Sequence, residues 1–281
     1  MKVLVTGANG YIGQGVLKEL LKMNVEIIAA DVIFEQRLPN IHYVTKSIFD
    51  EEDPFDAFGR PDVLLHLAWR DGFRHFSDSH IEDIPKHFFF LRKMIDSGVK
   101  QVCCMGSMHE IGFYEGCIDE NTPTKPISYY GIGKNSLRQI LELLVSEKSV
   151  VFQWIRGFYI VGNTERGCSI FSRITEAEKR GDSSFPFTSG TNQYDFIEYE
   201  LFCKEVVAVI MQKEVTGIIN CCSGIPERLG NRVEKFLKDN NYQIKLAYGT
   251  FPDRPYDSKA VWGSTSKIER IMDRYDDGSV S

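Results

Sequence analysis

The feature that most constrains this fold is a glycine-rich turn between an apolar run and an amphipathic segment, all within the first 23 residues. Residues 2–6 predict a buried strand, and residues 11–23 place apolar side chains at helical spacing. The turn between them reads Gly7-Ala8-Asn9-Gly10-Tyr11-Ile12-Gly13. A strand, a tight turn and a helix in this order predict the first unit of a parallel α/β sheet.

The same turn suits a phosphate, because its backbone N–H groups can approach a pyrophosphate at the helix N-terminus. A plain αβ turn is the alternative, but the strand before and the helix after it favour a dinucleotide site. The spacing is G-x-x-G-x-x-G rather than the commoner G-x-G-x-x-G. The residues that we expect to bind the cofactor here are Gly7, Asn9, Gly10, Tyr11, Ile12 and Gly13.

Asp31 closes the second predicted strand, residues 26–32. A carboxylate at this position can accept hydrogen bonds from the adenosine ribose hydroxyls and repels a 2′-phosphate, so it favours NAD over NADP. A solvent-facing aspartate at a strand end is the alternative. Arg37 lies a few residues further on, so use of NADP stays open.

Tyr130 and Lys134 are four residues apart in a predicted helix, residues 129–147, and therefore share a face. A nearby ammonium is expected to lower the tyrosine pKa from about 10, so that the phenol can exchange a proton with a carbonyl oxygen. Ser107 follows the predicted strand 101–105, at the sheet edge where ligands bind, and its hydroxyl can orient the same oxygen. A surface Tyr/Lys pair and a turn serine are the alternatives. With a hydride carrier, the three residues predict a ketone/alcohol oxidoreductase.

Composition excludes several other classes. A net charge of -6 over 281 residues argues against general nucleic-acid binding, and no apolar run approaches a membrane span of about 18 residues. No signal peptide is expected. The seven cysteines include pairs in apolar runs at 103–104 and 221–222, which we interpret as reduced core residues of a cytoplasmic protein. No Cys/His spacing predicts a metal.

Strand and helix signals alternate along the chain, which predicts an α/β fold with a doubly wound parallel sheet. We expect a dinucleotide-binding domain over 1–160 and a mainly substrate-binding lobe over 161–281, with 201–222 returning to the sheet. Residues 181–192 are expected to form a loop over a pocket, and 249–263 a surface loop. Strands are predicted at 2–6, 26–32, 42–45, 62–67, 101–105, 150–156 and 217–222, and helices at 11–23, 129–147 and 201–212.

Taken together, these motifs resemble the extended short-chain dehydrogenase/reductase family, in its NAD-dependent epimerase/dehydratase branch acting on nucleotide sugars. The resemblance implies a Rossmann sheet of about seven strands with a small C-terminal lobe. It makes Ser107, Tyr130 and Lys134 the catalytic triad, adds Leu67 and Ala68 to the cofactor contacts, and places Lys134 on the nicotinamide ribose. The motifs that carry it are residues 7–13, Asp31, 64–68, 106–107, 120–123, 126–134, 155–156, 195–197 and 254–255.

Departures from the family pattern concern the substrate. Met108 and His109 stand where family dehydratases have an Asp-Glu pair, so we do not expect dehydration. His109 also replaces a cysteine used by related epimerase-reductases, and is either an auxiliary acid/base or a structural histidine. Tyr194 replaces one diphosphate-binding arginine. Arg254 matches the other, unless it only forms a surface ion pair.

Two reactions fit this reading. The first is reduction of the 4-keto group of a nucleoside-diphosphate 4-keto-6-deoxyhexose, as in conversion of dTDP-4-dehydro-6-deoxyglucose to dTDP-fucose for surface polysaccharides such as O-antigen. The second is 4-epimerisation with tightly held NAD. A non-catalytic dinucleotide-binding regulator is the alternative of another class.

The resemblance also implies a homodimer, paired through the helix near 83–97 and the helix that carries Tyr130.

Overall fold

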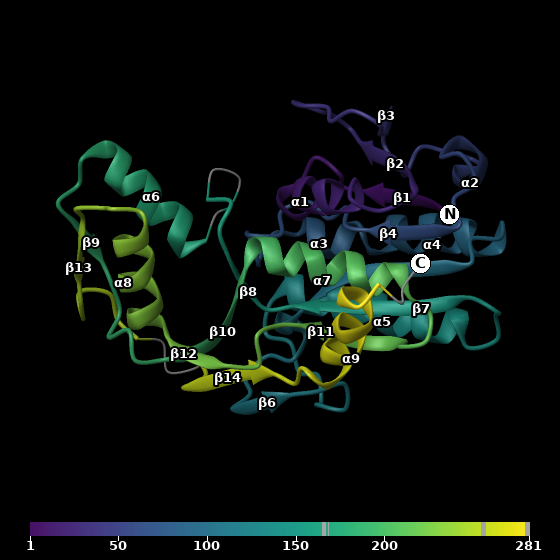
Figure 1. Cartoon of the computed structure of the whole chain (residues 1–281). Helices are drawn as coiled ribbons and strands as arrows, with labels where there is room; N and C mark the ends of the chain where they lie inside the picture. The colour runs from purple at the N-terminus through teal and green to yellow at the C-terminus, as the bar shows by residue number, and fades with distance from the viewer. Residues whose placement is uncertain (165–166, 168, 254–256, 279–281) are drawn as a thin grey trace.

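The computed structural model describes residues 1–164, 167, 169–253 and 257–278. Its centre is a seven-stranded parallel sheet in the order β11-β7-β5-β4-β1-β2-β3, so the predicted doubly wound α/β fold is confirmed (Figure 1). The strands of this sheet are β1 (Lys2–Thr6), β2 (Glu26–Asp31), β3 (His42–Thr45), β4 (Val63–His66), β5 (Gln101–Ser107), β7 (Val151–Gly157) and β11 (Gly217–Cys221).

The order of the strands indicates where a ligand is expected to bind. The chain runs outward from β1 to β2 and β3, then crosses back to β4 on the other side of β1. Ligands of open α/β sheets bind beyond the carboxyl ends of the strands at such a reversal. The turn after β1, Asp31 at the end of β2, Leu67 after β4 and Ser107 at the end of β5 all lie at this edge.

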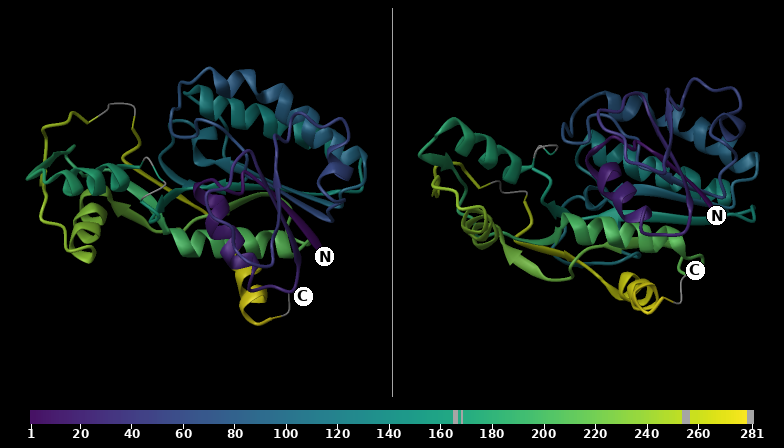
Figure 2. Two further views of the ribbon diagram at one scale, coloured as in Figure 1. Left: turned by 90° about the horizontal axis from the view of Figure 1, so that it is seen from above. Right: turned by 45° about the horizontal axis from the view of Figure 1, so that its top comes forward.

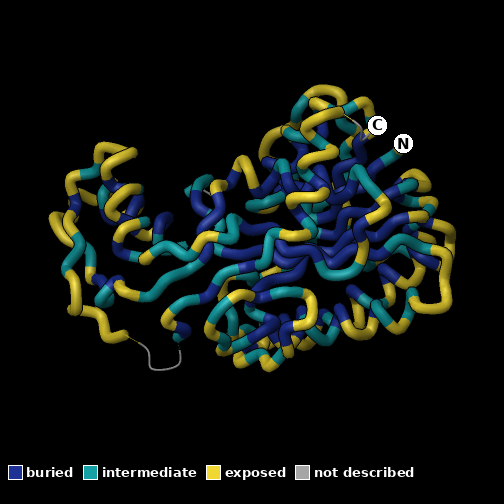
Figure 3. The backbone as a smooth tube through the Cα atoms, turned by 60° about the horizontal axis from the view of Figure 1, so that its bottom comes forward, coloured by how far each residue is buried: buried dark blue, intermediate teal, exposed yellow. Residues whose placement is uncertain are grey.

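Helices cover both faces of the sheet, as strands buried on both faces require. Cys103 packs in the core beneath α1, α7 and α9, whereas its neighbour Cys104 packs in the core beneath α4 and α5. The main sheet is accordingly the most deeply buried part of the chain (Figure 3). The helices are α1 (Tyr11–Leu20), α2 (Pro54–Ala57), α3 (Ser79–Glu82), α4 (Ile84–Asp96), α5 (Tyr129–Val145), α6 (Ile170–Arg180), α7 (Tyr199–Met211), α8 (Leu229–Asp239) and α9 (Ser266–Asp276), with a 3-10 turn η1 (Met108–Glu110).

A smaller lobe stands at one end of the main sheet (Figure 2). Its helices α6 and α8 share an apolar core with Phe187 and Phe196. Among the described residues, no helix is long and apolar enough to cross a membrane. The remaining strands form a five-stranded sheet, in which β8 pairs with β10 beside the main path, and a two-stranded sheet. They are β6 (Gly116–Ile118), β8 (Tyr159–Val161), β9 (Ser184–Pro186), β10 (Gln193–Glu198), β12 (Pro226–Arg228), β13 (Lys245–Ala247) and β14 (Ala260–Gly263).

Two expectations about secondary structure in the C-terminal part of the chain were wrong. Residues 249–263 were expected to form a loop, but they include β14, which pairs in parallel with both β10 and β6. Residues 181–192 include β9, paired with β13. These strands have only three or four residues, too few to show a period, and only their partners from distant parts of the chain stabilise them.

Candidate active site

Glycine is required at Gly7 and Gly13 because other backbone segments lie very close to both residues. Gly7 has φ +68°, and a Cβ there would lie 2.6 Å from the backbone nitrogen of Ala68. A Cβ at Gly13 would lie 2.5 Å from the carbonyl oxygen of Gly7. The turn therefore packs directly against the segment after β4, which brings the predicted cofactor residues Leu67 and Ala68 beside it. Such a cradle leaves the N-terminus of α1 open to a pyrophosphate and fits a dinucleotide.

Tyr11 connects this turn to the lobe. Its hydroxyl donates to the carbonyl oxygen of Gly162 at 2.9 Å, and its own carbonyl accepts the Tyr199 hydroxyl at 2.6 Å. Its backbone lies at the first position of α1, after Gly10, and Ile12 follows it in the helix. The predicted pyrophosphate site is thus held to the first residues beyond β8.

Asp31 lies at the end of β2, next to the glycine turn. Its carboxylate accepts the Asn9 N–H at 2.9 Å and the Val32 N–H at 2.7 Å. Arg37, the residue that left NADP open, packs its guanidinium 5.2 Å from the centroid of the Tyr43 ring and donates to the Thr45 hydroxyl. A carboxylate at this place suits the ribose hydroxyls of NAD, and that role of Asp31 stays a prediction.

Ser107 is the last residue of β5 rather than the first residue beyond it, and it caps η1. Its hydroxyl accepts the His109 N–H at 3.3 Å, and its N–H donates to the Glu110 carboxylate at 2.7 Å. Glu110 is fully buried and also accepts the indole N–H of Trp154 at 2.9 Å. Burial raises the pKa of Glu110, and Arg156 opposes that rise. This reciprocal cap holds the serine hydroxyl at the end of the strand.

Tyr130 is the second residue of α5 and forms a hydrogen bond with Ser107. Burial raises the pKa of Tyr130 to about 12, and a hydrogen bond with Ser107 opposes that rise. The expectation that Lys134 would bring the tyrosine pKa below its ordinary value is therefore wrong. The Lys134 ammonium lies 6.0 Å from the centroid of the phenol ring, and burial is the largest cause of the shift in the tyrosine pKa. Tyr130 is thus a protonated phenol at neutral pH.

Lys134 is buried below the tyrosine. Its ammonium donates to the Met105 carbonyl oxygen at 2.7 Å and lies 3.9 Å from the centroid of the Trp69 ring. Burial lowers the pKa of Lys134 to about 7, although Glu110 and Cys104 oppose the shift. The lysine therefore changes charge near neutral pH, a property that a surface lysine does not have.

His109 belongs to the same cluster. The centroid of its ring lies 4.4 Å from that of His75, 6.0 Å from Tyr130 and 6.5 Å from Tyr159. Burial lowers the pKa of His109 to about 4, which is below the range expected of an auxiliary acid/base at neutral pH. It is a neutral imidazole between the tyrosine and the lobe. The predicted Arg254 lies outside the described residues.

Reasoning from sequence missed three residues here: Trp69, His75 and His80. All three come from the segment between β4 and α4, and each ring contacts the catalytic pair. The available signal was the concentration of aromatic and histidine residues between positions 69 and 80. Nothing periodic marks such a loop, so its relation to Tyr130 appears only in three dimensions.

Comparisons with known proteins identify the family of this chain. Residues 3–222 match the NAD dependent epimerase/dehydratase family. The chain is 39% identical over 272 residues to a dTDP-6-deoxy-L-talose 4-dehydrogenase (NAD(+)) from Aggregatibacter actinomycetemcomitans, covering 94% of this chain and 100% of the relative. It is 21% identical to a GDP-6-deoxy-D-talose 4-dehydrogenase from the same organism, covering 97% and 91%.

A similar solved structure is the UDP-glucuronic acid 4-epimerase of Bacillus cereus in complex with UDP-glucuronic acid and NAD. Its TM-score is 0.82 at 18% identity, covering 97% of this chain and 93% of that one. The likeness supports the fold. The family match and the talose dehydrogenase together confirm the prediction of NAD as cofactor. This chain is a member of the NAD-dependent epimerase/dehydratase family of nucleotide-sugar enzymes, within the extended short-chain dehydrogenases/reductases.

Proposed function

We propose that this protein interconverts the 4-keto and 4-hydroxyl forms of a nucleoside-diphosphate 6-deoxyhexose, and that it acts as a 4-ketoreductase. The observation that carries the proposal is the convergence of Ser107, Tyr130 and Lys134 at the carboxyl edge of the sheet. The 39% identical relative is named for oxidation at the same carbon of such a sugar, and the reduction is the reverse of that reaction.

The chemistry needs one hydride and one proton. NADH held at the glycine turn would supply the hydride for C4 and would leave as NAD. Tyr130 then gives its phenolic proton to the C4 oxygen, and the Ser107 hydroxyl orients that oxygen. Lys134, when protonated, stabilises the resulting phenolate. A tyrosine whose pKa lies near 12 is protonated at neutral pH, so it can donate a proton to the C4 oxygen as reduction requires.

The cofactor and substrate would occupy different parts of the chain. We assign NAD to residues 1–160 and the sugar nucleotide mainly to 161–281. Arg254 is proposed for the diphosphate, and His109 and Tyr159 for the wall beside the sugar. The cofactor contacts that we propose are Gly7, Asn9, Gly10, Tyr11, Ile12, Gly13, Asp31, Leu67, Ala68, Tyr130 and Lys134.

The relative's name makes a dTDP-6-deoxytalose the first product to look for, ahead of the dTDP-fucose that we expect from sequence. Met108 and His109 replace the two acids of the family's dehydratases, so loss of water is not proposed.

The direct test supplies dTDP-4-keto-6-deoxyhexoses and NADH and follows loss of NADH absorbance, with GDP, UDP and CDP sugars in the same panel. We expect consumption of NADH in proportion to the keto sugar. Protein that retains NAD through purification and interconverts C4 epimers without added NADH would instead establish the epimerase.

Replacement of Tyr130 by Phe removes the proton donor and should lower kcat by about 100-fold or more, with NADH affinity retained. Tyr129→Phe is the matched control, because the neighbouring phenol is 42% exposed and packs against Phe76. Equal turnover in the two variants would exclude Tyr130 as the donor. NADH binding without turnover of any sugar by the wild type would favour the regulator hypothesis.

A further inference from the structure

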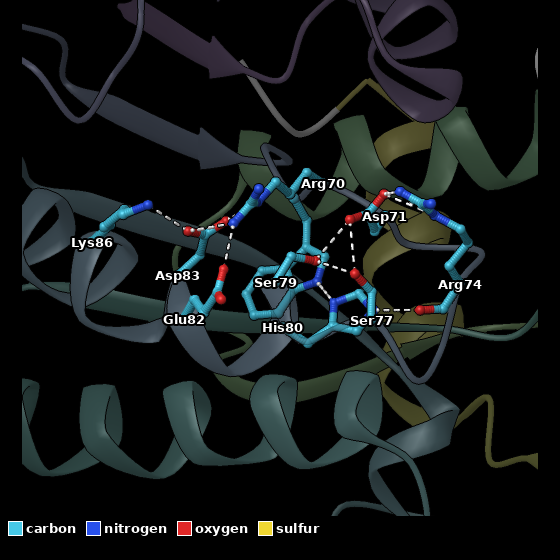
Figure 4. A network of polar contacts seen from close by, with 10 residues as sticks. Arg70, Asp71, Arg74, Ser77, Ser79, His80, Glu82, Asp83 and Lys86 are labelled. Carbon is cyan, nitrogen blue, oxygen red and sulfur yellow. Dashed lines mark hydrogen bonds and ion pairs between the residues drawn. The ribbon is translucent and has the colours of Figure 1, made fainter.

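The segment between β4 and α3, residues 69–78, has no role in the proposed reaction, although it lies against the catalytic pair. Asp71 is the centre of this loop (Figure 4). Its carboxylate accepts hydrogen bonds from the Ser77 hydroxyl at 3.0 Å and the Ser79 hydroxyl at 2.8 Å, and it pairs with Arg74. One side chain thus binds both the middle and the end of the loop.

Further contacts close the loop from its two ends. The Trp69 indole N–H donates to His80 Nδ1 at 2.9 Å, and His80 Nε2 lies 3.0 Å from the Arg74 carbonyl oxygen. Because the indole can only donate, His80 Nδ1 accepts and Nε2 carries the proton. Arg70 pairs with Asp83 at the start of α4. The backbone between these anchors is therefore held in one shape.

The closed loop presents His75 to Tyr130. The two rings are nearly parallel, with an interplanar angle of 11° and centroids 5.1 Å apart. The carbonyl oxygen of His75 also accepts the backbone N–H of Tyr130 at 3.0 Å. That N–H belongs to the first turn of α5, where no carbonyl of the helix can accept it. His75 therefore contacts both the backbone and the ring of the tyrosine.

The stacking geometry allows His75 to orient the Tyr130 ring but not to give it a proton. A parallel imidazole presents its face to the phenol and not an N–H, so it restricts the tilt of the ring without supplying a proton. Burial and the neighbouring His80 lower the pKa of His75, which keeps the imidazole neutral. The His80 ring also contacts the phenol, at 65° with centroids 5.3 Å apart. The phenol thus contacts two histidines that come from positions 75 and 80.

We propose that His75 is a positioning residue for Tyr130: the loop that Asp71 closes holds the imidazole against the phenol and so sets the angle at which its hydroxyl meets the substrate oxygen. The inference rests on the proposed role of Tyr130 as proton donor. It concerns orientation, and it predicts that the flat ring at position 75 matters more than its nitrogen atoms.

The experiment measures kcat, KM and NADH affinity for His75→Ala and His75→Phe, each in the wild type and in Tyr130→Phe. We expect His75→Ala to lower kcat by about 10-fold, because small misplacements of a reacting group are costly, with KM and NADH affinity within about twofold. His75→Phe should restore most of the rate. In the Tyr130→Phe background, His75→Ala should have little further effect, because the two residues act as one unit.

Three results would overturn the inference: wild-type kcat in His75→Ala, a His75→Phe variant as slow as His75→Ala, or the same 10-fold loss in the Tyr130→Phe background. Crystal structures of the wild type and His75→Ala give a readout that does not need turnover. A displaced Tyr130 ring in the variant supports positioning even where no sugar is reduced and the proposed function fails. An unmoved ring contradicts positioning even where reduction is observed.

Discussion

At the scale of single residues, burial determines the chemistry of the catalytic pair. The same burial that raises the pKa of Tyr130 to about 12 lowers that of Lys134 to about 7, because each shift favours the neutral form. The tyrosine therefore holds its proton at neutral pH, and the lysine is close to losing its own. The four-residue spacing alone predicts that Lys134 lowers the pKa of Tyr130, which is the opposite of the shift that burial produces.

The Lys134 shift has a consequence for stability. Between pH 7 and 9 the unfolded chain keeps the lysine proton, with a pKa of about 10.4, while the native protein releases it, so stability should rise with pH. A Lys134→Met variant lacks this contribution. The free energy of unfolding of the wild type, minus that of the variant, should increase by about 2 kcal/mol over this range.

Denaturant unfolding of both proteins at pH 7 and pH 9, without cofactor, measures this difference. Groups that titrate in both proteins cancel in the subtraction. Parallel changes in the two proteins would show that the pKa of Lys134 lies near its ordinary value.

At the scale of elements, the candidate site lies in the loops at the carboxyl edge of the sheet, and specific contacts stabilise each loop. The glycine turn packs on the backbone after β4, η1 is capped by Ser107 and Glu110, and the segment 69–78 is closed by Asp71. Rigid strands place the loops, and these contacts remove their freedom. Catalytic groups are thereby oriented before the substrate binds.

Gly13→Ala tests the cradle at this scale. The added Cβ would stand 2.5 Å from the Gly7 oxygen and 2.6 Å from the Ala8 oxygen, both backbone atoms that cannot rotate away. We expect NADH affinity, measured by fluorescence titration, to fall by about tenfold or more. Gly72→Ala is the control, because nothing lies within 4 Å of its added Cβ. Similar losses in both variants would show that the turn is not specific to the cofactor.

At the scale of the whole molecule, α4 and α5 leave apolar side chains uncovered on the outer face. The exposed fractions are 54% for Phe89, 37% for Ile140 and 76% for Leu143. Phe90 and Leu91, from the same apolar run as Phe89, are buried in the core instead. Apolar residues on two adjacent helices are consistent with the homodimer that the family resemblance implies, and we propose this face as its interface.

Leu143→Glu should convert a dimer to a monomer while leaving the fold intact, because a charge would be buried without a partner at the interface. Light scattering after gel filtration gives the mass, and circular dichroism checks the fold. Ile225→Glu, at a residue that is 69% exposed in the lobe, is the control. A wild-type protein that elutes as a monomer at micromolar concentration would refute the proposed interface.

What the sequence by itself determined is local in character. Strand and helix periods, the glycine turn and the four-residue spacing of Tyr130 and Lys134 each depend on neighbours in the chain, and they sufficed for the parallel sheet and the catalytic edge. The ends of elements were less certain: α1 stops at Leu20, whereas its apolar pattern continues to residue 23.

Only the tertiary structure decided the features that depend on distant parts of the chain. His75 stacks on Tyr130, which lies 55 positions further along the chain. Strand β14 forms because it pairs with β10 and β6. The direction of each pKa shift followed from burial, which no local pattern reports. Desolvation and non-local pairing arise only when the whole chain is folded, so the spacing of Tyr130 and Lys134 indicated a candidate site but could not predict the pKa shifts of its groups.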